Sequence, residues 1–208
     1  MTAIEAADER LLLWISGLAG HLPPLDSFMR LVVNDYFVPV TLSLILVALW
    51  FSGQDQEGRE HNQRTAILVG FAIGLSSAIV VICNDFYYRP RPFVHLDDLW
   101  VTAHNMVAPP LIFYPPTDSS LPSNIAAVLF AVAAAMWIRN RKLGLVVAIP
   151  AFLVCFARIF AGVHYPLDIV AGASIGIVSA YVAHRLVSPL LEPLVEKGLK
   201  LARKLCLA

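Results

Sequence analysis

Long apolar runs, separated by short polar stretches, dominate the chain. Five of them approach the ~20 residues that a helix needs to cross the hydrocarbon core of a bilayer. They cover residues 33–51, 65–83, 122–138, 143–161 and 166–187. Because the bilayer core offers no water to backbone polar groups, such runs form helices. The pattern therefore predicts an all-α integral membrane bundle with five full spans.

The two ends of the chain follow a different pattern. Residues 1–22 begin with acidic side chains and continue into a short apolar run that stops at Pro23. This favours an amphipathic helix at the membrane interface over a cleaved leader or a full span. Residues 188–208 alternate leucines with the basic residues Lys197, Lys200, Arg203 and Lys204. That alternation predicts a helix lying on the membrane surface.

Composition agrees with a membrane protein. Of the 208 residues, 58% are hydrophobic and only 14% are charged, and the mean hydropathy is +0.71. A soluble domain is rarely so apolar, so we interpret residues 1–208 as one integral membrane domain. The formal net charge is zero, and no basic excess favours a nucleic-acid partner.

Basic residues are distributed unevenly between the two sides of a five-span chain. One side carries Arg59, Arg64, Arg139, Arg141, Lys142, Arg185 and the four basic residues of the C-terminal segment. The other side carries Arg30, Arg89, Arg91 and Arg158. The richer side is expected to be cytoplasmic. Three polar clusters then meet on the opposite, extracytoplasmic face.

The most informative cluster is the segment 158–168, which contains Arg158, His164 and Asp168 between two apolar runs. His164 and Asp168 are one helical turn apart. A carboxylate at that spacing can hold one imidazole nitrogen and leave the other available as a nucleophile or base. Any one of these residues alone is better explained as a helix cap or an interfacial anchor.

Two further polar clusters lie at the ends of other apolar segments. One is Arg89-Pro90-Arg91-Pro92, and the other surrounds Ser123. Three such clusters are unlikely to have arisen independently. Guanidinium groups bind phosphate in bidentate fashion, and the amides after Pro122 open a helix, where an anion is favoured. The sequence shows no acidic cluster for two metals, so we expect phosphoryl transfer without a metal or cofactor, with covalent attack by His164.

These motifs resemble the PAP2 family of membrane lipid phosphatases, which is related to the vanadium haloperoxidases. The family's third motif, Arg, five residues, His, three residues, Asp, matches in full at Arg158, His164 and Asp168. The resemblance implies that these residues bind phosphate, attack phosphorus and orient the nucleophile, respectively. It covers residues 65–187 in order and spacing. The residues in and around these motifs are most similar to those of bacterial undecaprenyl-diphosphate phosphatases of this family. This resemblance implies a bacterial inner membrane protein.

The first two motifs match in part. Arg91 follows the family pattern, but Asn84 stands where a lysine is expected. In the second motif Ser123 matches, whereas Asn124 and Ile125 replace glycine and histidine. The replaced histidine protonates the leaving oxygen in the family, and isoleucine cannot donate a proton.

The residues thus predict His164 and Asp168 as catalytic, with phosphate held by Arg91, Arg158, Ser123, Asn124 and Arg89. The expected reaction is hydrolysis of a polyprenyl diphosphate or related lipid phosphate through a phosphohistidine. Ile125 leaves open a catalytically weak lipid-phosphate binding protein, or replacement of the acid by His95 or His104 from residues 84–121. A transporter is the third alternative, but it would need polar residues near the middle of several spans.

Overall fold

The chain is a bundle of helices, shown by a computed structural model that describes residues 2–34, 36–107 and 119–204. No strand occurs among these residues. The helices are α1 (Ala3–Ser16), α2 (Pro23–Val33), α3 (Phe37–Phe51), α4 (Gln56–Phe86), α5 (Pro92–His95), α6 (Asp97–Met106), α7 (Asn124–Arg139), α8 (Arg141–Phe160), α9 (Pro166–Val182), the π-helical turn Ala183–Val187, and α10 (Ser188–Lys204). The predicted all-α class is confirmed.

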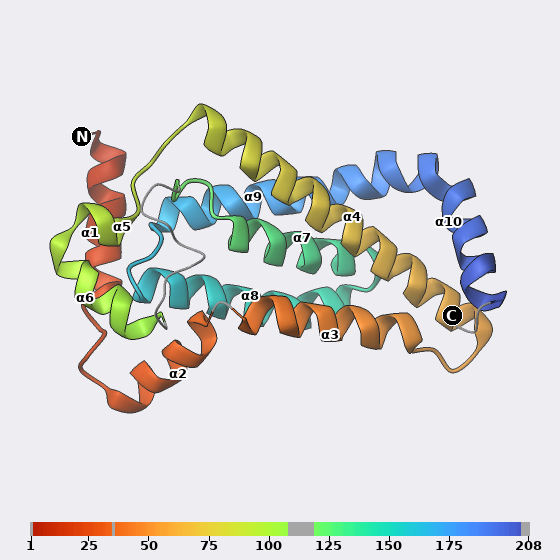
Figure 1. Ribbon diagram of the computed structural model, residues 1–208, viewed down its shortest axis with the longest axis horizontal. Coiled ribbons are helices and arrows are strands. Elements are labelled where there is room, and N and C mark those ends of the chain that lie inside the picture. Colours follow the sequence, from red (N-terminus) through yellow and green to blue (C-terminus); the bar gives the residue numbers. More distant parts are fainter. Residues whose placement is uncertain (1, 35, 108–118, 205–208) are drawn as a thin grey trace.

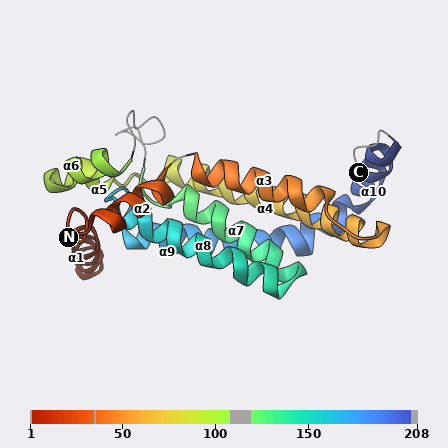
Figure 2. The same cartoon turned by 90° about the horizontal axis from the view of Figure 1, so that it is seen from below.

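The long helices run side by side, and the short ones lie at the two ends. Helices α3, α4, α7, α8 and α9 follow the long axis of the molecule (Figures 1 and 2). Helices α1, α5 and α6 gather at one end, which we call the site end, and α10 crosses the opposite end. The stretch 84–121, which lies between the predicted spans 65–83 and 122–138, contains the end of α4 and the two short helices α5 and α6. Residues 108–118 lie outside the described residues.

Within the described residues, three helices are long and apolar enough to cross a membrane. They are α4 with 31 residues, α8 with 20, and Pro166–Leu186 with 21. A fourth span results if α2 and α3, which meet at a bend of 59°, are taken together. Helix α7 is apolar but has only 16 residues. The number of five full spans therefore stays a prediction.

The predicted first span, 33–51, is interrupted near its start. The side chain of Asn34 accepts the Tyr36 N–H at 3.0 Å. Such a local hydrogen bond gives the backbone an alternative to the helix ladder. Helix α2 accordingly ends at Val33, and α3 begins at Phe37.

Helices α7 and α9 make the closest contact in the bundle, through glycine. A Cβ added at Gly172 would collide with the Ser123 carbonyl oxygen, and one at Gly176 with the Ala127 carbonyl. The absence of side chains lets the two backbones approach, as in other membrane helix pairs. This contact sets the N-terminus of α7 beside that of α9, where the polar clusters lie.

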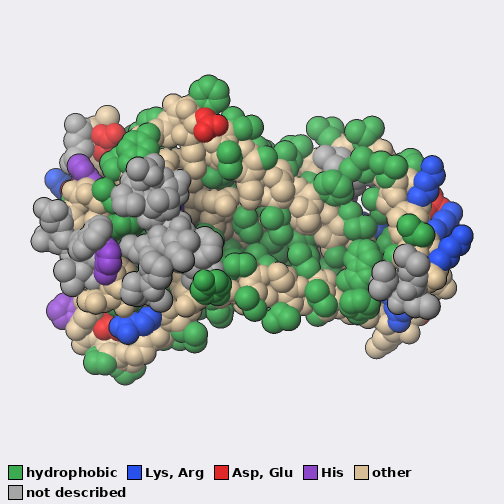
Figure 3. Space-filling view, in the orientation of Figure 1, with side chains coloured by type: hydrophobic (Ala, Val, Ile, Leu, Met, Phe, Trp, Pro, Cys, Tyr) green, Lys and Arg blue, Asp and Glu red, His purple; other side chains and the backbone are tan. Residues whose placement is uncertain are grey.

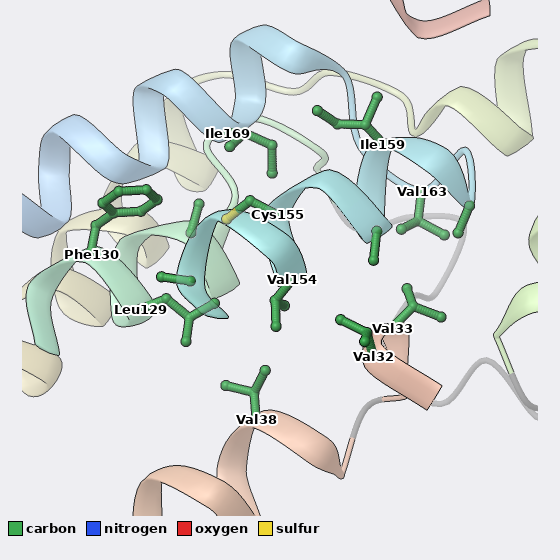
Figure 4. Packing of buried hydrophobic residues seen from close by; sticks show 14 of the residues in the cluster. Val32, Val33, Val38, Leu129, Phe130, Val154, Cys155, Ile159, Val163 and Ile169 are labelled. Carbon is green, nitrogen blue, oxygen red and sulfur yellow. The ribbon is translucent and has the colours of Figure 1, made fainter. Parts of the chain in front are cut away.

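The apolar core fills the space between these helices. Val154 of α8 projects into the space between Leu129 of α7, Val32 of α2 and Val38 of α3 (Figure 4). The core therefore joins the interrupted α2–α3 segment to the rest of the bundle.

Charge is confined mainly to the two ends. In the view of Figure 3, hydrophobic side chains cover much of the middle of the molecule, and the Lys and Arg side chains gather largely at the end where α10 lies. Arg203 of α10 pairs with Glu60 of α4 at 2.7 Å, and Arg64 pairs with Glu192. The predicted C-terminal helix is thus present and tied to α4, while its contact with a membrane surface remains a prediction.

Candidate active site

The three polar clusters meet at the site end, as predicted from hydropathy. Arg91 lies 3.3 Å from His164, His164 lies 3.5 Å from Asp168, and the Ser123 N–H donates to the Asp168 carbonyl at 3.0 Å. Arg158, Ser123 and Asp168 are fully buried, and His164 is only 3% exposed. Arg91 and Ser123 are far in the sequence from the segment 158–168, and the contact between α7 and α9 and the turn after α8 bring them together.

The turn after α8 places His164. Helix α8 ends at Phe160, and Gly162 has φ 72°, a left-handed conformation that suits glycine. Pro166 then opens α9 at its first position, where its fixed φ suits a helix start. Arg158 lies in the last turn of α8, and its carbonyl accepts the Val163 N–H at 3.1 Å.

Both nitrogens of His164 have partners that determine its proton position. Nδ1 lies 3.1 Å from the Ser120 carbonyl oxygen and 3.5 Å from Asp168 Oδ2, and both atoms can only accept. Nε2 lies 3.3 Å from Nη1 of Arg91, which can only donate. These contacts favour the neutral imidazole with its proton on Nδ1. Nε2 then carries the lone pair that a nucleophile needs.

The pKa of His164 is lowered to about 4, chiefly by burial and also by the nearby Arg91 and Arg158 cations, whereas Asp168 opposes the shift. Desolvation acts in this direction because it penalises the protonated imidazolium. His164 is therefore unprotonated at neutral pH. A residue that attacks phosphorus must be in that state.

Asp168 is held from three directions. Its Oδ2 accepts the Tyr165 N–H at 2.8 Å, its Oδ1 accepts from Arg89 at 2.7 Å, and its side chain is fully buried. With its own carbonyl bound by Ser123, the residue has little freedom to rotate. Asp168 is thus placed to hold the imidazole of His164, as the spacing predicted.

Arg89 has contacts that the sequence did not suggest. Its two amino groups donate to Asp168 and to Asp8, each at 2.7 Å, and its guanidinium lies 3.7 Å above the centre of the Tyr165 ring. Burial would lower the pKa of Arg89, but the carboxylates of Asp168 and Asp8 raise it, and the group is charged. Arg89, expected to bind phosphate, is therefore committed to two carboxylates here.

Asp8 is the site residue that sequence reasoning missed. It belongs to α1, whose buried face also includes Leu12 and Ile15. The only sequence signal was an acidic residue on the same helical face as the apolar residues four and seven positions later. Helix α1 is present as predicted, but it packs on α8 and α9.

The second cluster opens α7. The Ser123 hydroxyl accepts the Ala126 N–H at 3.4 Å and caps the helix, whereas Asn124 is exposed. Ile125 packs against the hydrophobic core. His95, one proposed substitute acid, is exposed and lines a cavity of about 210 Å³ next to Arg89 and Tyr165. His104, the other, lies in the last turn of α6.

The site is suited to a phosphate group. Three guanidinium groups, of Arg89, Arg91 and Arg158, face two carboxylates and one neutral imidazole, which leaves an excess of positive charge beside Nε2 of His164. Guanidinium groups stabilise the charge that develops on a transferring phosphoryl group. Within the described part of the chain, no three His, Cys, Asp or Glu side chains are grouped as a metal site.

Comparison with known proteins matches the same part of the chain. The family model described as "PAP2 superfamily" matches residues 65–191. The undecaprenyl-diphosphatase BcrC of Bacillus subtilis is 32% identical over 183 residues, which are 88% of this chain and 84% of that protein. An undecaprenyl-diphosphatase of Sulfolobus acidocaldarius is 32% identical over 114 residues, 52% of this chain and 50% of that protein.

Two solved structures share the fold. Aquifex aeolicus LpxE superposes with a TM-score of 0.58 at 23% identity, over 85% of this chain and 93% of that chain. A phosphatidylglycerolphosphate phosphatase of the PAP2 type from Bacillus subtilis superposes with a TM-score of 0.59 at 18% identity, over 88% and 86%. At this level of identity the likeness concerns the arrangement of helices.

Proposed function

Since the chain belongs to the PAP2 superfamily and is a multi-pass bacterial membrane lipid phosphatase, we propose that it hydrolyses a polyprenyl diphosphate such as undecaprenyl diphosphate. The observation that carries the proposal is the neutral, buried His164, with Nε2 facing Arg91 and Nδ1 facing Asp168. The similarity to undecaprenyl-diphosphatases supports the substrate class.

In the proposed reaction Nε2 of His164 attacks the terminal phosphorus. An N–P bond forms, the P–O bond to the lipid phosphate breaks, and the lipid monophosphate leaves with the electron pair. Arg91 and Arg158 bind the phosphoryl oxygens, and the N-terminus of α7, at Ser123 and Asn124, adds the positive end of a helix. Asp168 stabilises the positive charge that the imidazole gains. Water then attacks the phosphohistidine and releases phosphate.

We place this reaction at the extracytoplasmic face of the inner membrane. The basic residues Arg64, Arg139, Arg141 and Lys142 lie on the opposite side of the predicted spans, and an excess of basic residues marks the cytoplasmic side. A diphosphate carried on a lipid would reach the site end from the bilayer. The clustering of polar groups at one end, rather than along the spans, disfavours transport.

Ile125 restricts the substrates that the site can process. A monophosphate expels an alkoxide, which needs a proton, and Ile125 packs against hydrocarbon and has none to give. A diphosphate expels a phosphate monoester, whose second pKa is about 6, so it can leave as an anion at neutral pH. The missing acid therefore favours diphosphates. A binding protein without turnover is the alternative that Ile125 supports.

Phosphate release by the purified protein in detergent, compared between undecaprenyl diphosphate and the corresponding monophosphate, tests the proposal. We expect release from the diphosphate and an acid-labile phosphoryl group on His164 when the reaction is quenched and analysed by mass spectrometry. Binding of the diphosphate without release from any lipid would instead establish the binding protein. A phosphoryl group on another residue would refute the assigned nucleophile.

A further inference from the structure

An ion-pair chain links the N-terminal helix to Asp168. Asp8 Oδ2 accepts from Nη2 of Arg89, and Nη1 of the same guanidinium donates to Asp168 Oδ1, both at 2.7 Å. The side chains of Asp8, Arg89 and Asp168 are 1%, 14% and 0% exposed. Water therefore screens these interactions weakly, and the geometry of each group is coupled to the next.

Asp8 also holds the start of α9. Its Oδ1 accepts the Leu167 N–H at 2.9 Å, one residue before Asp168 in the chain. This amide belongs to the first turn of α9, whose N–H groups have no partner inside the helix and favour a negative charge. Asp8 thus contacts both the side-chain partner of Asp168 and the backbone from which Asp168 projects.

The alternative is that Asp8 only fixes α1 to the bundle. Leu12 and Ile15 already bury the apolar face of α1, and burying an ion pair adds little net stability compared with hydrocarbon of similar size. Attachment of the helix alone does not require a carboxylate aimed at Arg89. The bridging geometry is better explained by a requirement at the site.

We propose that Asp8 is a positioning residue for phosphoryl transfer: through Arg89 and the Leu167 amide it orients Asp168 and keeps it an effective partner of His164. This inference rests on the proposed function and extends it to α1, which lies outside the matched residues 65–191.

The charge balance gives Asp8 a second effect. Asp8, Arg89 and Asp168 together carry one net negative charge, so Asp168 still stabilises the positive charge that the His164 imidazole gains on attacking phosphorus. Without the Asp8 charge, Arg89 would neutralise Asp168 and draw its carboxylate away from His164. Loss of the Asp8 charge would therefore destabilise the transition state more than it weakens substrate binding.

The test compares Asp8→Asn with Glu9→Gln, which removes the same charge from the same helix. The asparagine side chain keeps an oxygen for the Leu167 amide and has nearly the same shape as aspartate. For Asp8→Asn we expect kcat of the folded enzyme to fall about 10- to 100-fold, the range seen when hydrogen-bond partners behind metal ligands are removed, while KM stays near wild type. The melting temperature should fall as well, because a buried ion pair loses one partner. Glu9→Gln should behave as wild type.

A fall in melting temperature with kcat of the folded enzyme unchanged would show that Asp8 is only structural, and it would overturn the proposal. Equal losses in both variants would do the same. If Asp8→Asn does not fold, Asp8→Glu keeps the charge but alters the reach, and it should fold and lower kcat with KM unchanged. A wild-type kcat in Asp8→Glu would count against the proposal.

Binding of orthovanadate, a phosphate analogue that can accept an imidazole nitrogen as a ligand, separates this inference from the proposed function. If the wild type binds vanadate but releases no phosphate from any lipid, the proposed function fails. Weaker vanadate binding by Asp8→Asn than by the wild type and Glu9→Gln would then still support the positioning role of Asp8. Equal vanadate binding by the wild type and Asp8→Asn would refute that role. If the wild type neither binds vanadate nor releases phosphate, both proposals fall.

Discussion

Each end of the bundle has an arginine held between two carboxylates, but in different surroundings. At the site end Arg89 lies between Asp8 and Asp168, whose side chains are 1% and 0% exposed. At the opposite end Arg64 lies between Glu60 and Glu192, which are 34% and 51% exposed. The chemical groups are alike, and the dielectric around them is not.

Burial decides what such an arrangement does. Exposed pairs contribute about 0–1 kcal/mol, because water and salt screen them and ordering two long side chains costs entropy. Removing one partner of a buried pair costs about 3–5 kcal/mol, because a charge is left without compensation. We therefore expect the opposite end to tolerate substitution and the site end to be sensitive to it. The following experiments test that contrast.

The largest difference is expected between two histidines. His164→Ala should reduce phosphate release at least ~10³-fold, because it removes the proposed nucleophile. His61→Ala, at the opposite end beside Arg139, should leave the rate near wild type. Rates are measured as phosphate release from undecaprenyl diphosphate. Turnover by His164→Ala close to wild type would exclude the phosphohistidine mechanism.

A general acid introduced at position 125 should increase activity at the site end. Ile125→His should raise turnover of the lipid monophosphate by about 10²–10⁴-fold, the usual contribution of general acid catalysis, and raise diphosphate turnover less. The ratio of the two rates at matched lipid concentration is the measurement. Equal gains on both substrates would mean that position 125 does not act through protonation of the leaving group.

Phosphate binding distinguishes the arginines of the two ends. Arg91→Ala and Arg158→Ala should each weaken orthovanadate binding by about 2–5 kcal/mol, because buried cations contact the anion. Arg139→Ala, where the side chain contacts Thr65 and His61, should not change it. Isothermal titration provides the constants. Similar losses in all three variants would indicate a general electrostatic effect.

The pH dependence follows from the pKa of His164, lowered to about 4 by burial. Above pH 4 the imidazole is unprotonated, so His164 should not limit kcat/KM between pH 4 and 6.5; below pH 4 kcat/KM falls about tenfold per unit. The unfolded histidine titrates near 6.5, so the unfolded state binds more protons between these values, and stability is lost as pH falls from 6.5 to 4. An acid limb of kcat/KM at pH 6.5 would contradict the buried, neutral nucleophile.

The smallest effect is expected at the opposite end. Glu192→Gln breaks an exposed pair with Arg64 and should lower the free energy of unfolding by less than about 1 kcal/mol without changing kcat. Thermal melting in detergent at low and high salt measures it. A loss above about 2 kcal/mol would mean that α10 is bound more tightly than its exposure indicates.

Some features of the site follow from local spacing and were predictable. Arg158, His164 and Asp168 lie within one turn-and-helix segment, so their order along the chain already places them together. Gly162 and Pro166 act through their own backbone restrictions, which do not depend on distant residues. Hydropathy likewise depends on runs of neighbouring residues, and it predicted the helical class that the structure confirms.

Other features depend on contacts between distant segments or on single side chains. The short helices α5 and α6 have no strong apolar period, and the break after Val33 arises from one side chain of Asn34. Helix α7 is shorter than its apolar run because it begins after its cap at Ser123. A hydropathy average over many residues does not detect the effect of one side chain. Helix boundaries and the number of spans were therefore harder to predict than the helical class.

The helical class, the membrane location and the clustering of Arg158, His164 and Asp168 could be predicted without a structure, because each depends on a local pattern of residues. The partners of Arg89 could not, because they depend on how distant segments pack together. Asp8 and Asp168 lie far apart along the chain, and the sequence around an acidic residue on an amphipathic helix does not indicate its tertiary contact partners. The contact depends on how α1 packs against α8 and α9, and it places a carboxylate of the N-terminal helix within the candidate active site.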